Sequence, residues 1–170
     1  MSDILKPDDS LLSVTNIVVF KEVFGCPNND YEILKSFLSS IIGIPKEEYA
    51  SFEFPDSSLI DQENLRYDIG IMDVKIKTKS GEKIKLRIQI LHEEGQKNLA
   101  LLNVMKMISE QPMPTYRNPL QKCISIIIST KGSFDSSKAY SNKYMLCSEK
   151  TKTIFTDKIQ IYTMELEKLP

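Results

Sequence analysis

Apolar and charged residues alternate along residues 73–89 with a period of two. Such alternation is typical of β-strands with one buried and one exposed face. Ser80 and Gly81 divide the segment and suit a tight turn, so the pattern predicts a β-hairpin. One face carries the apolar residues Val74, Ile76, Ile84, Leu86, Ile88 and Ile90, and the other carries Asp73, Lys75, Lys77, Lys79, Lys83, Lys85, Arg87 and Gln89. We therefore expect Asp73, Arg87 and Gln89 to lie close together on the charged face.

The rest of the chain predicts an alternation of helices and strands. Apolar residues at helical spacing predict helices near residues 15–25, 30–42 and 96–110, each followed by glycine or proline. Short strands are expected near residues 52–54, 144–147 and 159–164. The nearly continuous apolar run at residues 123–128 predicts a central strand that is buried on both faces. This order predicts an α/β fold with a central mixed β-sheet flanked by helices, in a single domain of residues 1–170 with a loose start over residues 1–12.

The hairpin also resembles the catalytic frame of the PD-(D/E)XK nuclease fold. That frame carries an Asp on the first strand, an acidic residue on the returning strand and, two places later, a Gln or Lys. Asp73 and Gln89 match it, but Arg87 stands where the family carries its Glu.

Three further segments resemble the recombination-promoting nuclease and transposase branch of that fold. Residues 15–25 resemble its opening helix, although Ile17 replaces the usual Asp, residues 116–128 resemble a core strand, and residues 159–168 resemble the closing strand. The resemblance implies a restriction-endonuclease-like core, DNA as the substrate and Mg²⁺ as the cofactor. Family members usually continue in a further C-terminal region, so we expect this chain to be a short form or a trimmed piece.

The substitution at residue 87 changes the expected chemistry. Nucleases of this fold hold Mg²⁺ between two carboxylates. Here Asp73 is the remaining ligand, and Arg87 is always protonated. The sequence therefore predicts that the metal site is lost and that an Asp73–Arg87 ion pair fills it. If the protein cuts DNA, Asp73 and Gln89 carry the reaction. The alternative, that another carboxylate takes the ligand role, stays open for Glu22, Asp68, Glu93 and Glu94.

The lysines of the hairpin give a second prediction. Lys75, Lys77, Lys83 and Lys85 share one face with Arg87, and such a basic ribbon could follow the phosphates of DNA. The simpler interpretation is that these lysines confer solubility and protect an edge strand. The net charge of −1 gives no overall attraction to nucleic acid. A non-catalytic DNA-binding or regulatory module, acting as a homo-oligomer or paired with an active family member, is therefore the alternative to a nuclease.

The remaining features favour a reduced, soluble protein. Cys26, Cys123 and Cys147 are widely spaced and are expected to be free thiols. No apolar stretch approaches the length of a membrane span, so we expect a cytoplasmic location and no membrane partner. His92 is the single histidine and is interpreted as a surface residue. Met105 and Met107 are expected to pack in the core.

Overall fold

The structure, a computed structural model, describes residues 17–25, 27, 30–55, 70–91, 97–131, 134 and 136–169. The helices are α1 (Ile17–Gly25), α2 (Glu32–Ile42) and α4 (Lys97–Ser109), with short 3₁₀ turns η1 (Lys46–Glu48) and η2 (Leu166–Lys168). The strands are β1 (Tyr49–Glu53), β2 (Gly70–Thr78), β3 (Lys83–Leu91), β4 (Lys122–Ser129), β5 (Ser141–Cys147) and β6 (Ile154–Glu165). Five residues named above, together with the loose start at 1–12, lie outside the described residues: Cys26, Asp68, His92, Glu93 and Glu94.

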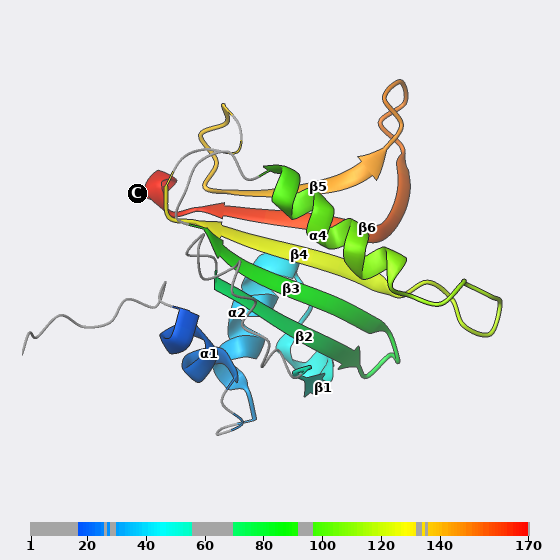
Figure 1. The fold of residues 1–170 in the computed structure, drawn as a ribbon, viewed down its shortest axis with the longest axis horizontal. Helices are drawn as coiled ribbons and strands as arrows, with labels where there is room; N and C mark the ends of the chain where they lie inside the picture. Colours follow the sequence, from blue (N-terminus) through cyan, green and yellow to red (C-terminus); the bar gives the residue numbers. More distant parts are fainter. Residues whose placement is uncertain are drawn as a thin grey trace, which may run out of the picture.

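The strands form one mixed sheet. Its order is β1-β2-β3-β4-β6-β5, with parallel pairing of β3 to β4 and of β4 to β6 and antiparallel pairing elsewhere. In Figure 1, α4 crosses one side of the sheet, while α1 and α2 lie on the other. The predicted α/β fold with a central mixed sheet flanked by helices is confirmed.

Each face of the sheet has its own core. The larger core packs α1 and α2 against the even-numbered residues of β2, β3 and β4, and we call this side the α1–α2 face. The opposite side, the α4 face, carries the odd-numbered residues, and there α4 packs on Cys123 and Ile127 of β4 and on Ile159 and Ile161 of β6. All residues of β4 after Lys122 are buried, which confirms a strand covered on both sides.

Burial differs from the sequence prediction at three positions on the α4 face. Gln89, expected on an exposed charged face, is fully buried, because α4 covers the sheet beyond Arg87. Met107 packs in the core as expected, but the prediction for Met105 is wrong, since it is 42% exposed. Leu102, an apolar residue that was expected to help bury this helix, is 63% exposed. One face of α4 is thus buried against the sheet, while its outer face still carries apolar residues.

Two observations bear on the thiols and on the membrane prediction. Cys123 is buried and Cys147 is exposed, and both are free. Burial raises the pKa of the Cys123 thiol above its ordinary value. Among the helices that the structure describes, none is long and apolar enough to cross a membrane.

The core assignment leads to a stability prediction. Ile126 in β4 is fully buried, whereas Ile33 on α2 is 56% exposed. We expect Ile126→Ala to lower the free energy of unfolding by about 2–5 kcal/mol, because it leaves a cavity in the core between the sheet and the helices α1 and α2. Ile33→Ala should change it by less than about 0.5 kcal/mol. Urea denaturation of both variants measures the difference, and equal effects would contradict the assigned core.

Candidate functional site

Two side chains meet across the β2–β3 hairpin at the predicted site. The strands pair antiparallel from Gly70–Ile90 to Lys77–Lys83, and this register places Asp73 directly opposite Arg87. Arg87 donates through Nε to Asp73 Oδ1 at 2.6 Å and through Nη2 to Asp73 Oδ2 at 2.7 Å. The ion pair expected from the sequence is therefore present. It is bidentate, the geometry in which Arg and a carboxylate bind most strongly.

A third side chain fixes the guanidinium from the helix above it. Asn103, buried on α4, accepts through Oδ1 a 2.9 Å hydrogen bond from Arg87 Nη1. The Arg87 and Asp73 side chains remain 19% and 26% exposed, so the pair is shielded but still reaches the surface. The hydrogen bonds to Asp73 raise the pKa of Arg87 above its ordinary value, against the opposing effect of burial. The positive charge of Arg87 is thus permanent and fixed in place.

Buried polar groups adjoin this pair. Gln89 follows Arg87 on the same face of β3, and Ser125 lies opposite Arg87 on β4. Both are fully buried, and the Gln89 amide atoms, the Ser125 hydroxyl and Asn103 Nδ2 lack hydrogen-bond partners among the described groups. Buried polar atoms without hydrogen-bond partners lower the stability of the fold, so their presence needs an explanation. One explanation is that they belong to a functional site. We call Asp73, Arg87, Gln89, Asn103 and Ser125 the polar cluster.

The polar cluster does not fit a magnesium ion. Magnesium is bound by hard oxygen ligands, usually one or two carboxylates completed by water. Asp73 is the only carboxylate in the polar cluster, and both of its oxygens accept hydrogen bonds from Arg87. Over the described ranges, no group of three or more His, Cys, Asp or Glu side chains could hold a metal. A cation bound by Asp73 would also face the fixed positive charge of Arg87.

The carboxylates proposed as substitute ligands do not enter the cluster where the structure describes them. Glu22 is exposed on α1, which packs on the α1–α2 face, opposite to the side chain of Asp73. Asp68, Glu93 and Glu94 lie outside the described residues. Glu110, exposed just beyond α4, raises the pKa of Arg87 through its charge, as the smallest of the contributions. The Glu110 carboxylate therefore adds negative potential near the guanidinium and makes no ion pair with it within 4 Å.

The lysines flank the polar cluster on the same face. The hairpin register sets Lys75 opposite Lys85 and Lys77 opposite Lys83. Like charges directly opposite each other destabilise a sheet. Lys75 is neutralised by Glu53 of β1, with 2.6 Å between Nζ and Oε1. We call Lys77, Lys83 and Lys85, which have no ion pair with any described residue, the basic face.

Sequence reasoning found the pair and the lysines but missed Asn103. The available signal was a polar residue at a helical spacing otherwise occupied by buried Ala100, Val104 and Met107. A polar residue on the apolar face of a helix usually hydrogen-bonds to a buried partner. That partner, Arg87, could not be identified without knowing where α4 crosses the sheet.

Comparison with known proteins gives one result. A family model described as PD-(D/E)XK nuclease family transposase matches residues 15–170. Neither the curated proteins nor the solved structures gave a match.

The geometry of the ion pair leads to a quantitative prediction. We expect a double-mutant cycle of Asp73→Ala and Arg87→Ala to give a coupling free energy of about 1–3 kcal/mol, because the pair is bidentate and largely shielded from water. The exposed pair Lys75–Glu53 is the matched control on the same sheet, and its coupling should stay below about 1 kcal/mol. Denaturant unfolding of both cycles measures the two energies. A coupling for Asp73–Arg87 no larger than that of the control would show that the pair is not held as described.

Proposed function

This chain belongs to the PD-(D/E)XK nuclease family transposases, and we propose that within this family it binds DNA without cutting it. Members of the fold generally depend on a divalent metal for phosphodiester hydrolysis. We propose that in this chain the Arg87 guanidinium occupies the place where that metal would bind. A protein of this kind would act in DNA recombination by occupying a target that an active family member would otherwise cut.

The bidentate Asp73–Arg87 pair is the observation that carries the proposed loss of cleavage. A metal bound by Asp73 would have to displace a guanidinium that makes two hydrogen bonds to Asp73 and a third to Asn103. Hydrogen bonds to charged groups are worth about 1.5–3 kcal/mol each. Gln89, at the water-positioning place of the family frame, then has no metal-bound water to orient. The roles of Asp73, Arg87 and Gln89 in this proposal come from the family frame.

The basic face supports the proposal that the protein still binds DNA. Lys77 and Lys83 are both exposed and stand opposite each other, and Lys85 lies between them and Arg87 on the same side of the hairpin. Repulsion between these neighbouring cations lowers the stability of the sheet. A bound polyanion such as DNA relieves that repulsion. Lys75 contributes less, since Glu53 already pairs with it. No aromatic residue interrupts the row, so contact is to phosphates and is independent of sequence.

We also propose that the protein is located in the cytoplasm. Free thiols persist in reducing compartments, and the structure describes Cys123 and Cys147 as free.

Metal titration tests the loss of the metal site. We expect calorimetry with Mg²⁺ or Mn²⁺ to give no binding heat for the wild type. Arg87→Glu should bind the metal, because it restores a second carboxylate opposite Asp73. Arg87→Gln is the matched control, since it removes the positive charge without adding a ligand, and it should stay silent.

Two results would overturn the proposed loss of the metal site, and a third would refute its assignment to residues 73 and 87. Micromolar binding by the wild type would mean that other carboxylates form a site despite Arg87. Metal-dependent cleavage of plasmid DNA by the wild type would contradict the proposal directly. A folded Arg87→Glu variant that binds no metal would refute the assignment of residues 73 and 87 to one former metal site.

DNA binding tests the role of the basic face. We expect fluorescence anisotropy with a labelled duplex to show binding in EDTA that added Mg²⁺ does not strengthen, because the contacts are made by lysines and not through a metal. The double variant Lys77→Glu/Lys83→Glu should bind DNA more weakly. The negative slope of the logarithm of its association constant against the logarithm of the salt concentration should become shallower by about 2, one unit for each lost phosphate contact.

The matched control makes the same change of charge elsewhere. Lys138→Glu/Lys150→Glu alters two exposed lysines outside the basic face. Its affinity for DNA should stay close to that of the wild type. An equal loss of affinity for DNA in both double variants would mean that net charge alone explains the effect. Binding that disappears in EDTA would contradict the replacement of the metal by Arg87.

A further inference from the structure

The connection between α4 and β4 carries a fully exposed tyrosine. Residues 112–120 follow the end of α4 and precede Lys122, the first residue of β4, and we call them the proline loop because they contain three prolines. All residues from Pro112 to Pro119 are exposed, and the side chain of Tyr116 is completely so. Figure 1 shows this loop extending past the end of the sheet where the β2–β3 turn also lies. Tyrosine is usually at least partly buried, so its position here needs a reason.

The base of the proline loop is held by one side chain. Gln111 accepts through Oε1 a 2.9 Å hydrogen bond from the backbone N–H of Gln121. Its Nε2 donates to the backbone oxygen of Gln121 at 3.2 Å and to Sγ of buried Cys123 at 3.1 Å. These bonds join the two ends of the loop directly above the start of β4. The loop is therefore anchored in the body of the fold.

The tip of the loop is equally well defined. Thr115 and Asn118 exchange two backbone hydrogen bonds of 3.0 and 3.1 Å. The two residues between them, Tyr116 and Arg117, form the tip. Prolines on both sides of this turn restrict the backbone further. A side chain presented on such a fixed turn loses little conformational entropy when it binds a partner.

The proline loop lies at the same end of the sheet as the basic face. Parallel pairing of β3 with β4 sets Ile84 opposite Lys122, and Lys122 Nζ lies 2.9 Å from Oε1 of Glu82 in the β2–β3 turn. The loop also follows α4, which covers the side of the sheet to which the basic face belongs. A molecule that contacts Lys83 can therefore continue along this end of the sheet to the loop.

The free charge of the proline loop is positive. Arg117 is the single charged residue between Gln111 and Gln121, and it makes no ion pair with any described residue. Lys122 is already paired with Glu82 and Asp157, at 2.9 and 3.4 Å. The tip thus combines an aromatic ring with an unneutralised cation, two groups that together suit a nucleic acid.

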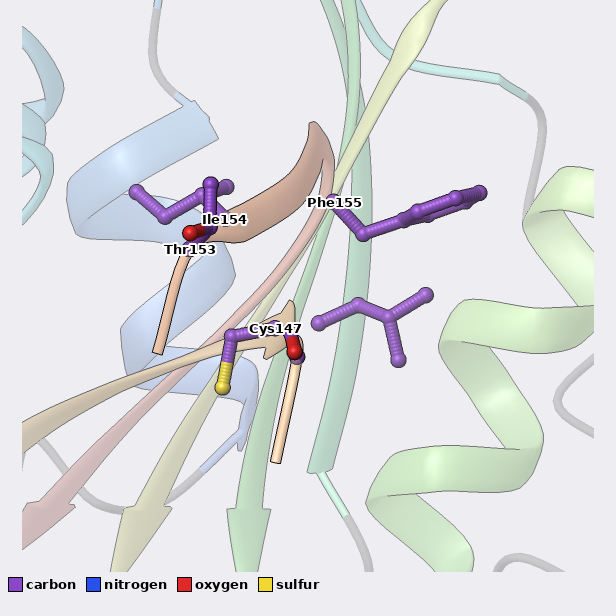
Figure 2. Close-up of a pocket in the computed structure, with 6 residues that line it drawn as sticks. Cys147, Thr153, Ile154 and Phe155 are labelled. Atoms are coloured by element: carbon purple, nitrogen blue, oxygen red, sulfur yellow. The ribbon is translucent and has the colours of Figure 1, made fainter. Parts of the chain in front are cut away.

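The chain carries another exposed aromatic residue, but its surroundings differ. Phe155 is 80% exposed. Figure 2 shows it at the open hollow of about 490 Å³ that is lined by Leu146, Cys147, Ser148, Thr153, Ile154 and Phe155. None of these six residues is charged, so the lining of the hollow offers no cation to a phosphate. At the tip of the proline loop, by contrast, Arg117 follows the ring directly.

We propose that Tyr116 stacks on an unpaired base of DNA held by the basic face, so that the protein prefers DNA with a single-stranded part. This inference rests on the proposed function. In an intact duplex the neighbouring pairs cover both faces of each base, so a tyrosine ring can stack only where a base is unpaired. Stacking is tolerant of sequence because every base has a π-face. Arg117 contacts an adjacent phosphate.

Fluorescence anisotropy with two labelled DNAs tests this preference. One is a blunt duplex, and the other is the same duplex with a tail of about 10 thymidines. We expect the wild type to bind the tailed duplex more tightly. Tyr116→Ala should weaken binding to the tailed duplex by about 5-fold or more and leave the blunt duplex unaffected. Tyr116→Phe keeps the ring and should keep the preference.

Tyr140→Ala is the matched control. It removes another exposed tyrosine, whose backbone oxygen accepts a hydrogen bond from Glu165 at the end of β6, on the opposite end of the sheet. Its affinity for both DNAs should equal that of the wild type.

Tryptophan fluorescence provides an independent readout, because the chain contains no tryptophan. Tyr116→Trp places a single fluorophore at the tip, and stacking on a base should quench its emission when the tailed duplex is added. Tyr140→Trp should show no change. Circular dichroism should show that these variants are folded, since both positions are exposed.

The outcomes separate a failure of this inference from a failure of the proposed function. A wild type that binds neither DNA would overturn both. Equal binding of the two DNAs by the wild type would overturn only the inference. A preference for the tail that survives Tyr116→Ala would place the contact elsewhere and refute the role of the tip. An equal loss on both DNAs in Tyr116→Ala would refute the selectivity for unpaired bases.

Discussion

The unbroken pairing of β2 with β3 determines which side chains can meet in this protein. A shift of one residue in this pairing would turn the faces of one strand relative to the other and bring the lysines of that strand into the core. The register is held by the isoleucines, leucine and valine of the α1–α2 face, which are almost fully buried. With that face fixed, Asp73 and Arg87 have to stand opposite each other on the other side. The chemistry of the polar cluster is therefore a consequence of core packing on the far side of the sheet.

The ion pair explains how the fold tolerates an arginine that is largely buried between the sheet and α4. A guanidinium near the core must recover the hydration it loses, and unpaired it would cost several kcal/mol. Asp73 supplies two acceptors and Asn103 a third. Removing either Asp73 or Asn103 would leave a partly buried charge short of acceptors. Asp73 thus has a structural task, since it holds the guanidinium of Arg87 in place.

The sequence was sufficient for features that depend on local pattern. Alternation identified the hairpin, its register and the Asp73–Arg87 pair, and the apolar run identified β4 as a strand covered on both faces. It was insufficient where a distant element decides the outcome. Gln89 is buried and Arg87 gains Asn103 because α4 crosses the sheet there, and no spacing along the chain states where a helix will cross. The irregular pairing of β5 with β6 was missed because two short strand signals do not reveal a bulge within one of the strands.

The position of the ion pair in the strand order bears on the course of folding. Asp73 and Arg87 are 14 residues apart and are joined by a tight turn, whereas β4 and β6 pair with partners that lie much further away along the chain. Local contacts of this kind form early, because little chain entropy is lost in closing them. A site that depends on a metal is completed only after the whole fold has brought its ligands together. Here the charges neutralise each other within the first hairpin to be synthesised, before α4 and the later strands exist to cover them.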